Sequence, residues 1–447
     1  MIDIQYIRDN AETVKTKSKQ KGYDVDVDKL LSLDKERKEL LQQIEEKRRE
    51  RNAFSSSISP SASVSPSPSS SPNPSPKPLP EQISQGKELK NALAVLEEKF
   101  KAIDTEWLGI LKQVPNMPLE DVPVGESEKD NQVAKTVGEP TKFDFQPKNH
   151  WEIGESRGWI DKERAAKVAG SRFAYIKGDL VKLQFAILQF GLDILTNEEI
   201  LQQIIADNNL KLSPKPFIPI LPPLMLKTDI YDAMDRLEPR DDRYKIEGEE
   251  LWLQGSAEHV LGSMHLDEVF AEKELPIRYA GFATSFRREA GTYGKDMEGI
   301  IRMHQFDKLE MESLTTAETS YDEHLLMIAI QEYLMQQLEL PYQMINKCTA
   351  DIGKPNARGW DVEAWMPGQN KYRETHTADY MTDYQARRLH TRVRRQDGST
   401  ELIHTNDATV FAMGRTMVAI IENFQDKDGK IKVPKVLKKY MGNREVL

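Results

Sequence analysis

The chain has 447 residues, of which 38% are hydrophobic and 30% charged, and its formal net charge at pH 7 is −10. This length suffices for two or three domains, while apolar runs stay shorter than the roughly 18 residues of a membrane-spanning helix. Its single cysteine, Cys348, excludes an intramolecular disulfide and a multi-cysteine zinc site. The N-terminus lacks the pattern of a signal peptide, so the cytoplasm is the expected compartment.

Two stretches near the N-terminus carry apolar residues with coiled-coil spacing. The first runs from Leu30 to Arg51 and loses its apolar character after Ile44. In the second, the apolar positions repeat at alternating steps of 4 and 3 residues: Leu89, Leu93, Leu96, Phe100, Ile103, Trp107, Ile110 and Val114. Two such helices joined by a connector bury each other's apolar stripe. We therefore predict an antiparallel helical hairpin.

The first of these helices is locally basic although the whole chain is acidic. Its cationic residues become denser toward its far end: Lys35, Arg37, Lys38, Lys47, Arg48, Arg49 and Arg51. Such a run is either the solvated face of a charged coiled coil or a patch that binds RNA phosphates. The sequence leaves both interpretations open.

A segment made almost entirely of Ser and Pro, residues 55–80, connects the two helices. Proline cannot continue a helix, and the segment has few apolar residues to bury, so we expect a disordered tip insertion. Pro115 and Pro118 end the second helix, and residues 119–150 are polar and rich in turn formers. We therefore expect a hairpin domain over residues 1–118, a linker over 119–150 and a larger domain over 151–447.

The larger domain mixes helix and strand signals. Apolar residues at helical spacing predict a helix over 180–194, residues 217–226 form a proline-interrupted extended segment, and further helices are expected over 316–340 and 408–425. Strand-like runs lie at 250–254, 277–287, 361–366 and 401–404. This pattern predicts an α+β fold built on an antiparallel sheet. The glycine-rich motifs of Rossmann and P-loop nucleotide sites do not occur.

Residues 286–310 carry the densest chemistry in the chain. Within one expected β-hairpin they place a glycine-marked turn among charged and aromatic residues: Arg287, Arg288, Glu289, Arg302, Phe306 and Glu310. Guanidinium groups grip phosphate oxygens, an aromatic face can stack on a base, and carboxylates accept hydrogen bonds from an amine. The stretch therefore predicts a nucleoside triphosphate site.

The same stretch closely resembles the second signature motif of class II aminoacyl-tRNA synthetases, in the form carried by seryl-tRNA synthetases. Further segments match that family in order: 170–178 with 222–223, Ser256–Glu258 in place of Thr-Ala-Glu, 367–374 with 383–388, and 414–425 as the third motif. The resemblance covers essentially the whole chain apart from the Ser/Pro segment. It implies the class II antiparallel sheet flanked by helices, the N-terminal hairpin and a homodimer.

By resemblance, ATP and Mg²⁺ bind in the class II domain. Arg287 is expected at the α-phosphate, Arg415 at the γ-phosphate, and Phe306 and Glu289 at adenine. Mg²⁺, bridging phosphates, is expected on Glu374 and Thr377. The remaining expected ATP contacts are Arg288, Arg302, Thr375 and His376. Arg287, Glu374 and Arg415 are the residues expected to act in catalysis.

The resemblance also implies the other substrates. L-serine is expected to bind through Ser256, Ala257, Glu258, Arg287, Glu310, Asp407 and Thr409. Its carboxylate attacks the α-phosphate, and the resulting seryl-adenylate passes serine to the 3′ end of tRNA(Ser), and of tRNA(Sec) where a cell has one. The hairpin is expected to grip the tRNA.

Three departures from the family pattern lie close to these residues. The usual Glu-Ile/Val-Ser-Ser is Glu374–Thr377, Cys-Ser-Asn is Ala378–Tyr380, and a common Asn is Asp407. Asp407 adds an acceptor that either strengthens ammonium binding or disturbs hydroxyl recognition. His376 is expected as a polar lining residue rather than as a zinc ligand.

Two alternatives come from other functional classes. One is a synthetase-like paralogue that delivers an activated amino acid to a non-tRNA carrier, which the altered 374–380 block favours. The other is a non-catalytic coiled-coil interaction protein, which would have no use for the combination of Arg287, Glu289, Phe306, Glu374 and Arg415. The helical hairpin and the single cysteine favour the synthetase over the paralogue.

Overall fold

The structure, a computed structural model, describes residues 1–58, 79–289 and 298–447. It divides into two compact units. The hairpin unit holds Ile2–Lys19 and Tyr23–Val114, and the sheet unit holds Met1, Gln20–Gly22 and Pro115–Leu447.

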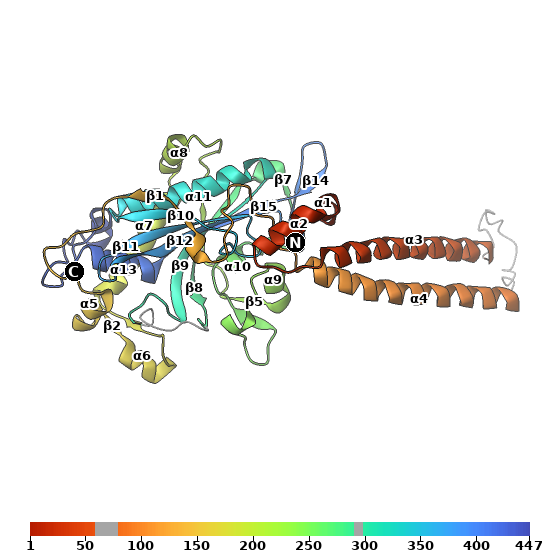
Figure 1. Cartoon of the computed structure of the whole chain (residues 1–447), viewed down its shortest axis with the longest axis horizontal. Helices are drawn as coiled ribbons and strands as arrows, with labels where there is room; N and C mark the ends of the chain where they lie inside the picture. The colour runs from red at the N-terminus through yellow and green to blue at the C-terminus, as the bar shows by residue number, and fades with distance from the viewer. Residues whose placement is uncertain (59–78, 290–297) are drawn as a thin grey trace, which may run out of the picture. The chain divides into compact units, whose positions relative to one another are not determined.

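The hairpin unit is helical, as predicted. Two short helices, α1 (Ile4–Asp9) and α2 (Ala11–Gln20), precede the long helices α3 (Val27–Ile58) and α4 (Pro80–Leu111). Helices α3 and α4 lie side by side along the hairpin (Figure 1). All eight predicted seam positions from Leu89 to Val114 are buried or half-buried, so the two helices cover each other's apolar stripe.

Polar contacts fix the register of the two long helices. Arg37 stands at a seam position, where its guanidinium lies 4.4 Å from the ring centroid of Trp107 and hydrogen-bonds Asp104. Farther along, Arg48 pairs with Glu97 at 2.7 Å. The partners' numbers fall on α4 as those on α3 rise, which is the antiparallel arrangement that the sequence predicted.

The ends of the hairpin helices follow the positions of proline. Pro80 opens α4 at its first turn, where a missing N–H costs nothing. Residues 55–58, expected as part of the disordered insertion, instead continue α3, because the first proline of the segment is Pro60. Pro80, the last residue of the expected insertion, belongs to α4, and the prediction for residues 59–78 lies outside the described residues.

An eight-stranded sheet forms the centre of the sheet unit. Its order is β1 (Gln132–Val137), β10 (Tyr342–Asn346), β11 (Arg358–Met366), β12 (Lys371–Thr382), β15 (His404–Ala412), β9 (Gln305–Thr315), β8 (Ile277–Phe286) and β4 (Ile218–Ile220). Neighbouring strands are antiparallel except for the parallel pair β4 and β8. The predicted α+β fold on an antiparallel sheet is confirmed.

Three helices cover the sheet and complete its hydrophobic core: α7 (Asp179–Leu195), α11 (Ala317–Gln337) and α13 (Met413–Asn423). Helix α11 packs along β12 and β15, and α13 contacts β9 and β11 (Figure 1). Smaller elements surround them: α5 (His150–Ser156), β2 (Ile160–Asp161), α6 (Lys162–Ala169), β3 (Tyr175–Ile176), α8 (Glu198–Asp207), β5 (Met225–Lys227), α9 (Thr228–Ala233), β6 (Leu251–Leu253), α10 (Glu258–Leu261), β7 (Val269–Ala271), α12 (Ala386–Leu389), β13 (Arg392–Arg394) and β14 (Thr400–Leu402).

Two segments differ from the sequence-based expectation. The helix predicted over 408–425 begins only at Met413, because residues 408–412 finish β15 between β12 and β9. Residues 132–137, within the segment expected as a linker, form the edge strand β1 against β10. Its side chains are mostly exposed, so it carried no apolar strand signal.

Candidate active site

The central strands separate a core face from a cavity face by simple alternation. On β9, Leu309 and Met311 point into the hydrophobic core, whereas Phe306 and Lys308 line a cavity of about 360 Å³. Successive residues of a strand point to opposite faces of the sheet. The same alternation on β12 and β15 sends Ala378 and Ala408 to the core and brings Thr377, Asp379 and Thr409 to the cavity.

A β-bulge brings Glu374 onto the cavity face. The register between β11 and β12 shifts between Val362 and Glu363, so Val362 faces His376 while Glu363 faces Glu374. Without this shift, Glu374 would share the core face with His376. Bulges often re-aim a side chain next to an active site, and this one places a carboxylate among the cavity cations.

One end of the cavity is built from residues of the 286–310 stretch. The Arg287 guanidinium lies 5.5 Å from the ring centroid of Phe306, and its Nε donates to the Gly255 carbonyl oxygen at 2.9 Å. Glu289 pairs with Arg302 at 2.6 Å. Strands β8 and β9 pair as the predicted hairpin, and its turn, residues 290–297, lies outside the described residues. This end offers a fixed cation beside the half-buried ring of Phe306, which lines the cavity.

Glu374 and Arg415 join strand β12 to helix α13. Arg415 Nη1 donates to Glu374 Oε1 at 2.7 Å. Desolvation in the cavity raises the pKa of Glu374, but the positive charges of Arg415 and Lys347 outweigh it and lower that pKa to about 2. Glu374 is therefore a carboxylate at neutral pH.

A lysine and an aspartate that the sequence did not single out lie beside Glu374. Lys347 Nζ is 3.3 Å from Asp361 Oδ2, and the Thr377 hydroxyl donates to the same aspartate. Burial raises the pKa of Asp361 to about 7 against the attraction of Lys347. Neither residue belongs to a recognisable motif, so only the fold reveals them.

The other end of the cavity is lined by oxygen-bearing side chains. Glu310 Oε1 accepts a hydrogen bond from the Ser256 hydroxyl at 2.6 Å, and Oε2 accepts one from the Glu258 backbone at 3.1 Å. Lys308 pairs with Glu310. The alternation along β9 could have revealed Lys308, which lies two residues before Glu310 on the same face.

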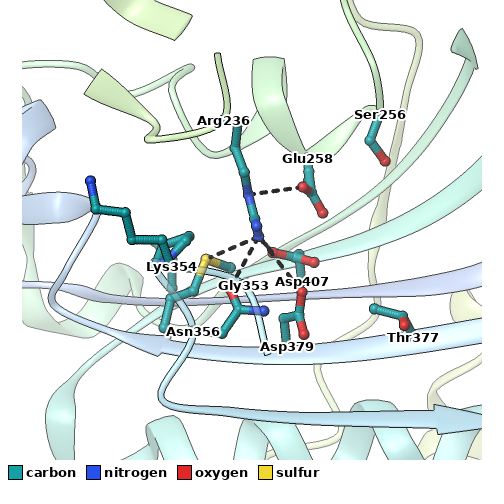
Figure 2. Close-up of polar contacts among 12 residues, drawn as sticks. Arg236, Ser256, Glu258, Gly353, Lys354, Asn356, Thr377, Asp379 and Asp407 are labelled. Atoms are coloured by element: carbon teal, nitrogen blue, oxygen red, sulfur yellow. Dashed lines mark hydrogen bonds and ion pairs between the residues drawn. The ribbon is translucent and has the colours of Figure 1, made fainter. Parts of the chain in front are cut away.

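Arg236 is a further cavity cation that the sequence did not reveal. It follows helix α9 and carries no motif signal. Its guanidinium lies between Glu258, Asp379 and Asp407 (Figure 2). Burial raises the pKa of Glu258, but the charge of Arg236 outweighs burial and holds that pKa well below its usual value.

The cavity gathers most of the predicted site residues. Those that line it are Glu258, Arg287, Glu289, Arg302, Phe306, Glu374, Thr375, Thr377, Thr409 and Arg415. Ser256, Glu310 and Asp407 are buried directly behind the lining, where they contact Lys308, Glu258 or Arg236. Ala257 is buried against Leu261 and Ala283.

Two predicted ATP contacts, Arg288 and His376, do not line the cavity. The backbone N–H of Arg288 donates to the Asp242 carbonyl oxygen at 3.1 Å, and Arg288 is not part of the lining. His376 lies on the core face, 1% exposed, with its ring centroid 5.9 Å from that of Phe411. Burial lowers the pKa of His376 to about 4, so this imidazole is neutral at pH 7.

The part of the chain that the structure describes holds neither a group of metal-ligating side chains nor a membrane-spanning helix. Over residues 1–58, 79–289 and 298–447, no three His, Cys, Asp or Glu side chains are grouped so as to hold a metal ion. Within those same ranges, no helix has both the length and the apolar character needed to cross a bilayer.

Comparison with known proteins assigns the two parts of the chain. Residues 243–424 match the class II core domain of the tRNA synthetases for G, H, P, S and T. The antiparallel sheet and its cavity are therefore the core of a class II aminoacyl-tRNA synthetase. Residues 1–118 match the seryl-tRNA synthetase N-terminal domain.

Full-length relatives narrow the class to one family. The serine–tRNA ligase of Thermodesulfovibrio yellowstonii is 38% identical over 444 residues, covering 99% of each chain. The crystal structure of seryl-tRNA synthetase from Pyrococcus horikoshii complexed with ATP has a TM-score of 0.85 and 34% identity, covering 100% of this chain and 99% of that one. The cytoplasmic serine–tRNA ligase of Naegleria fowleri, in complex with AMP, has a TM-score of 0.82 and 28% identity, covering 100% and 98%. The chain belongs to the seryl-tRNA synthetase family.

Proposed function

We propose that this protein activates L-serine with ATP and transfers it from seryl-adenylate to the 3′ end of tRNA(Ser), and of tRNA(Sec) in a cell that has one. The observation that carries the proposal is the convergence of Arg287, Phe306, Glu374 and Arg415 on one cavity from β8, β9, β12 and α13. Membership of the family supplies the reaction, and the cavity supplies groups suited to each part of ATP.

Adenine stacks on Phe306 and donates its amino group to Glu289. The α-phosphate lies against Arg287, whose planar fork is held by the Gly255 carbonyl oxygen at 2.9 Å, and the γ-phosphate lies against Arg415. Arginine stays charged and binds phosphate oxygens in a fixed geometry. The cations thus align the triphosphate before reaction, which lowers the barrier through positioning and charge stabilisation.

The first step needs no covalent enzyme intermediate. The serine carboxylate oxygen forms a bond to the α-phosphorus while the bond from that phosphorus to pyrophosphate breaks. Arg287 and Arg415 offset the negative charge that builds up on the phosphate oxygens. In the second step the terminal ribose hydroxyl of tRNA attacks the carbonyl carbon of seryl-adenylate, and AMP leaves.

Oxygen donors on the cavity face fit Mg²⁺. The Glu374 carboxylate and the Thr377 hydroxyl both line the cavity, and Mg²⁺ prefers oxygen ligands together with substrate phosphates. When bound, the ion would neutralise phosphate charge. The hydrogen bond from Arg415 at 2.7 Å holds the Glu374 carboxylate in the cavity, where it could bind the ion.

The amino acid binds at the end of the cavity formed by Glu258, Thr409 and Arg236, in front of Ser256, Glu310 and Asp407. Thr409 supplies a hydroxyl and Glu258 a carboxylate. A site built to hydrogen-bond a substrate hydroxyl rejects an analogue that lacks it, because its own buried polar groups would lose their partner. This chemistry favours serine over alanine.

We extend the proposal to the organisation of the protein. Residues 1–118 form the tRNA-binding domain and 151–447 the catalytic domain, whose central sheet also takes strand β1 from the 119–150 segment. The active form is a homodimer in the cytoplasm. The basic residues of α3 contact tRNA phosphates.

ATP–pyrophosphate exchange with serine, threonine, alanine, glycine and cysteine, before any tRNA is added, tests the proposal. Exchange that strongly favours serine supports it. Exchange with another amino acid, or none from folded protein, would favour a paralogue that loads a different carrier. The match of residues 1–118 to the seryl-tRNA synthetase N-terminal domain speaks against that alternative.

A further inference from the structure

Three acidic residues stand in one row across the middle of the sheet. Glu312 on β9 is the register partner of Asp407 on β15, and Asp407 is in turn the register partner of Asp379 on β12. All three are at most 6% exposed. Like charges directly opposite each other destabilise a sheet, and buried carboxylates need a partner. The row therefore requires compensation.

Arg236 compensates two members of the row, Asp379 and Asp407, together with the neighbouring Glu258. Its Nη2 lies 3.6 Å from Asp379 Oδ2 and 3.6 Å from Asp407 Oδ2, and its Nε lies 3.1 Å from Glu258 Oε1. Figure 2 shows the guanidinium reaching toward Asp379 and Asp407 with Glu258 beside it. One guanidinium thus bridges three carboxyl groups from α10, β12 and β15.

Arg236 is itself held in place. Its Nη2 also donates to Asn356 Oδ1 at 3.3 Å and approaches Met381 Sδ at 3.7 Å. The side chain is 13% exposed. The loop that carries Asn356 is fixed in turn by Lys21, whose ammonium donates to the Gly353 and Asn356 carbonyl oxygens at 2.9 and 2.7 Å.

The acidic side chains retain unused hydrogen-bonding capacity. Within the described residues, Asp379 Oδ1, Asp407 Oδ2 and both oxygens of Glu312 are buried without a hydrogen-bond partner. Asp379 and Glu258 also line the cavity. Several buried carboxyl groups share the single positive charge of Arg236. One further positive charge would therefore be stabilised here, and the ammonium group of an amino acid would supply it.

We propose that Arg236 is a positioning residue for the amino-acid site, which holds Glu258, Asp379 and Asp407 so that this end of the cavity binds the ammonium group of the substrate. The proposal rests on the proposed function. Asp379 and Asp407 stand where the family pattern has Ser and Asn, and Arg236 bridges both of these carboxyl groups.

Because Arg236 holds Glu258, Asp379 and Asp407, amino-acid binding should depend on Arg236 more strongly than ATP binding does. Without the guanidinium, three carboxyl groups face one another in a buried place, and they would take up protons and reorient. The proposed ATP contacts do not depend on Arg236, since the Gly255 carbonyl oxygen holds the Arg287 guanidinium beside the Phe306 ring. Loss of Arg236 should therefore change the KM for serine and leave the KM for ATP nearly unchanged.

Serine-dependent ATP–pyrophosphate exchange by the full-length protein tests the proposal, with R236Q, R236K and the triple variant R236Q/D379S/D407N. The matched control is R395Q. Arg395 has the same 13% exposure and also bridges three carboxylates, those of Glu272, Glu318 and Glu401, but it does not line the cavity. Thermal unfolding of each variant identifies the folded proteins.

We expect R236Q to raise the KM for serine on the order of 30-fold, the effect of removing one partner from a buried charge pair. The triple variant should recover most of this loss, and R395Q should change neither KM. If R236Q does not fold, R236K and the triple variant make the same comparison. Equal changes in both KM values, or a triple variant no better than R236Q, would overturn the proposal. Failure of the wild-type protein to exchange with serine would instead overturn the proposed function.

Discussion

Arg415 on α13 and Glu374 on β12 form a hydrogen bond of 2.7 Å between Nη1 and Oε1, and the same nitrogen donates to the Glu374 carbonyl oxygen at 3.0 Å. The cation proposed for the γ-phosphate is thus oriented by the carboxylate proposed for Mg²⁺. Because each side chain orients the other, removing one of them should impair the proposed binding of both the γ-phosphate and Mg²⁺. The pair acts as one unit.

The first prediction concerns this pair. E374Q and R415Q should each lower kcat for serine-dependent pyrophosphate exchange by about 10²–10³-fold, the usual effect of removing one charge-stabilising group. The double variant should lose much less than the product of the two single losses, because groups that act together are not additive. Single-turnover measurement of adenylate formation provides the test.

A matched control lies on the neighbouring strand. Glu363 is the register partner of Glu374 but bonds Gln343 at 2.6 Å and does not line the cavity. E363Q should therefore keep its kcat. Fully multiplicative losses in the double variant would show that the two side chains act independently.

The second prediction concerns Phe306, which lies 5.5 Å from the Arg287 guanidinium. F306A should raise the KM for ATP by roughly 5- to 150-fold, since stacking on an aromatic side chain contributes about 1–3 kcal/mol per base. F306Y keeps the ring face and should stay close to wild type. Steady-state exchange with varied ATP and saturating serine measures both. An unchanged KM in F306A would rule out stacking on this ring.

Part of the sheet was predictable because its signals are local. The strand-like runs at 277–287 and 361–366 gave β8 and β11, and helical spacing gave α7, to within a few residues, whereas β10 and β12 were not predicted. Strand β15 was partly misread as helix, since Ala408–Ala412 are compatible with either structure and only pairing with β9 and β12 decides.

The candidate site was predictable only where motifs carry it. Arg287, Phe306 and Arg415 stand in recognisable segments, and the cavity contains them. Arg236 and Lys347 stand in no motif, and they enter the cavity because loops far apart in sequence meet there. Glu374 and His376 point to opposite faces of the sheet because of a β-bulge. Residue spacing alone does not reveal this bulge.

The third prediction concerns pH and Asp361. Burial raises its pKa to about 7 in the folded protein, against about 3.9 in an unfolded chain. Between these values the folded state binds more protons than the unfolded state, so the free energy of unfolding falls as pH rises toward 7. Relative to D361N, which does not titrate, the wild type should lose about 2–3 kcal/mol between pH 5 and pH 8.

Urea unfolding of both proteins at several pH values measures this difference. A matched variant is D351N, since Asp351 also lies near Lys347, at 3.6 Å, but is half-buried. The wild type and D351N should share the pH trend that D361N lacks. Parallel curves for all three proteins would contradict a raised pKa at Asp361.

The last prediction separates the two steps of the reaction. Every described residue that lines the cavity belongs to the sheet unit, so deleting residues 27–114 should leave serine-dependent pyrophosphate exchange largely intact. The ends of the deletion can be joined by a short linker, because the ion pair of Lys29 with Glu106, at 2.6 Å, shows that α3 and α4 lie together at the base of the hairpin. The same deletion protein should no longer charge tRNA(Ser), since the residues proposed to contact tRNA phosphates lie on the deleted helix α3.

As a milder control, R49E/R51E should raise the KM for tRNA at fixed salt and leave exchange unchanged. Equal loss of exchange and charging in a folded deletion protein would mean that the hairpin also supports the chemistry in the cavity.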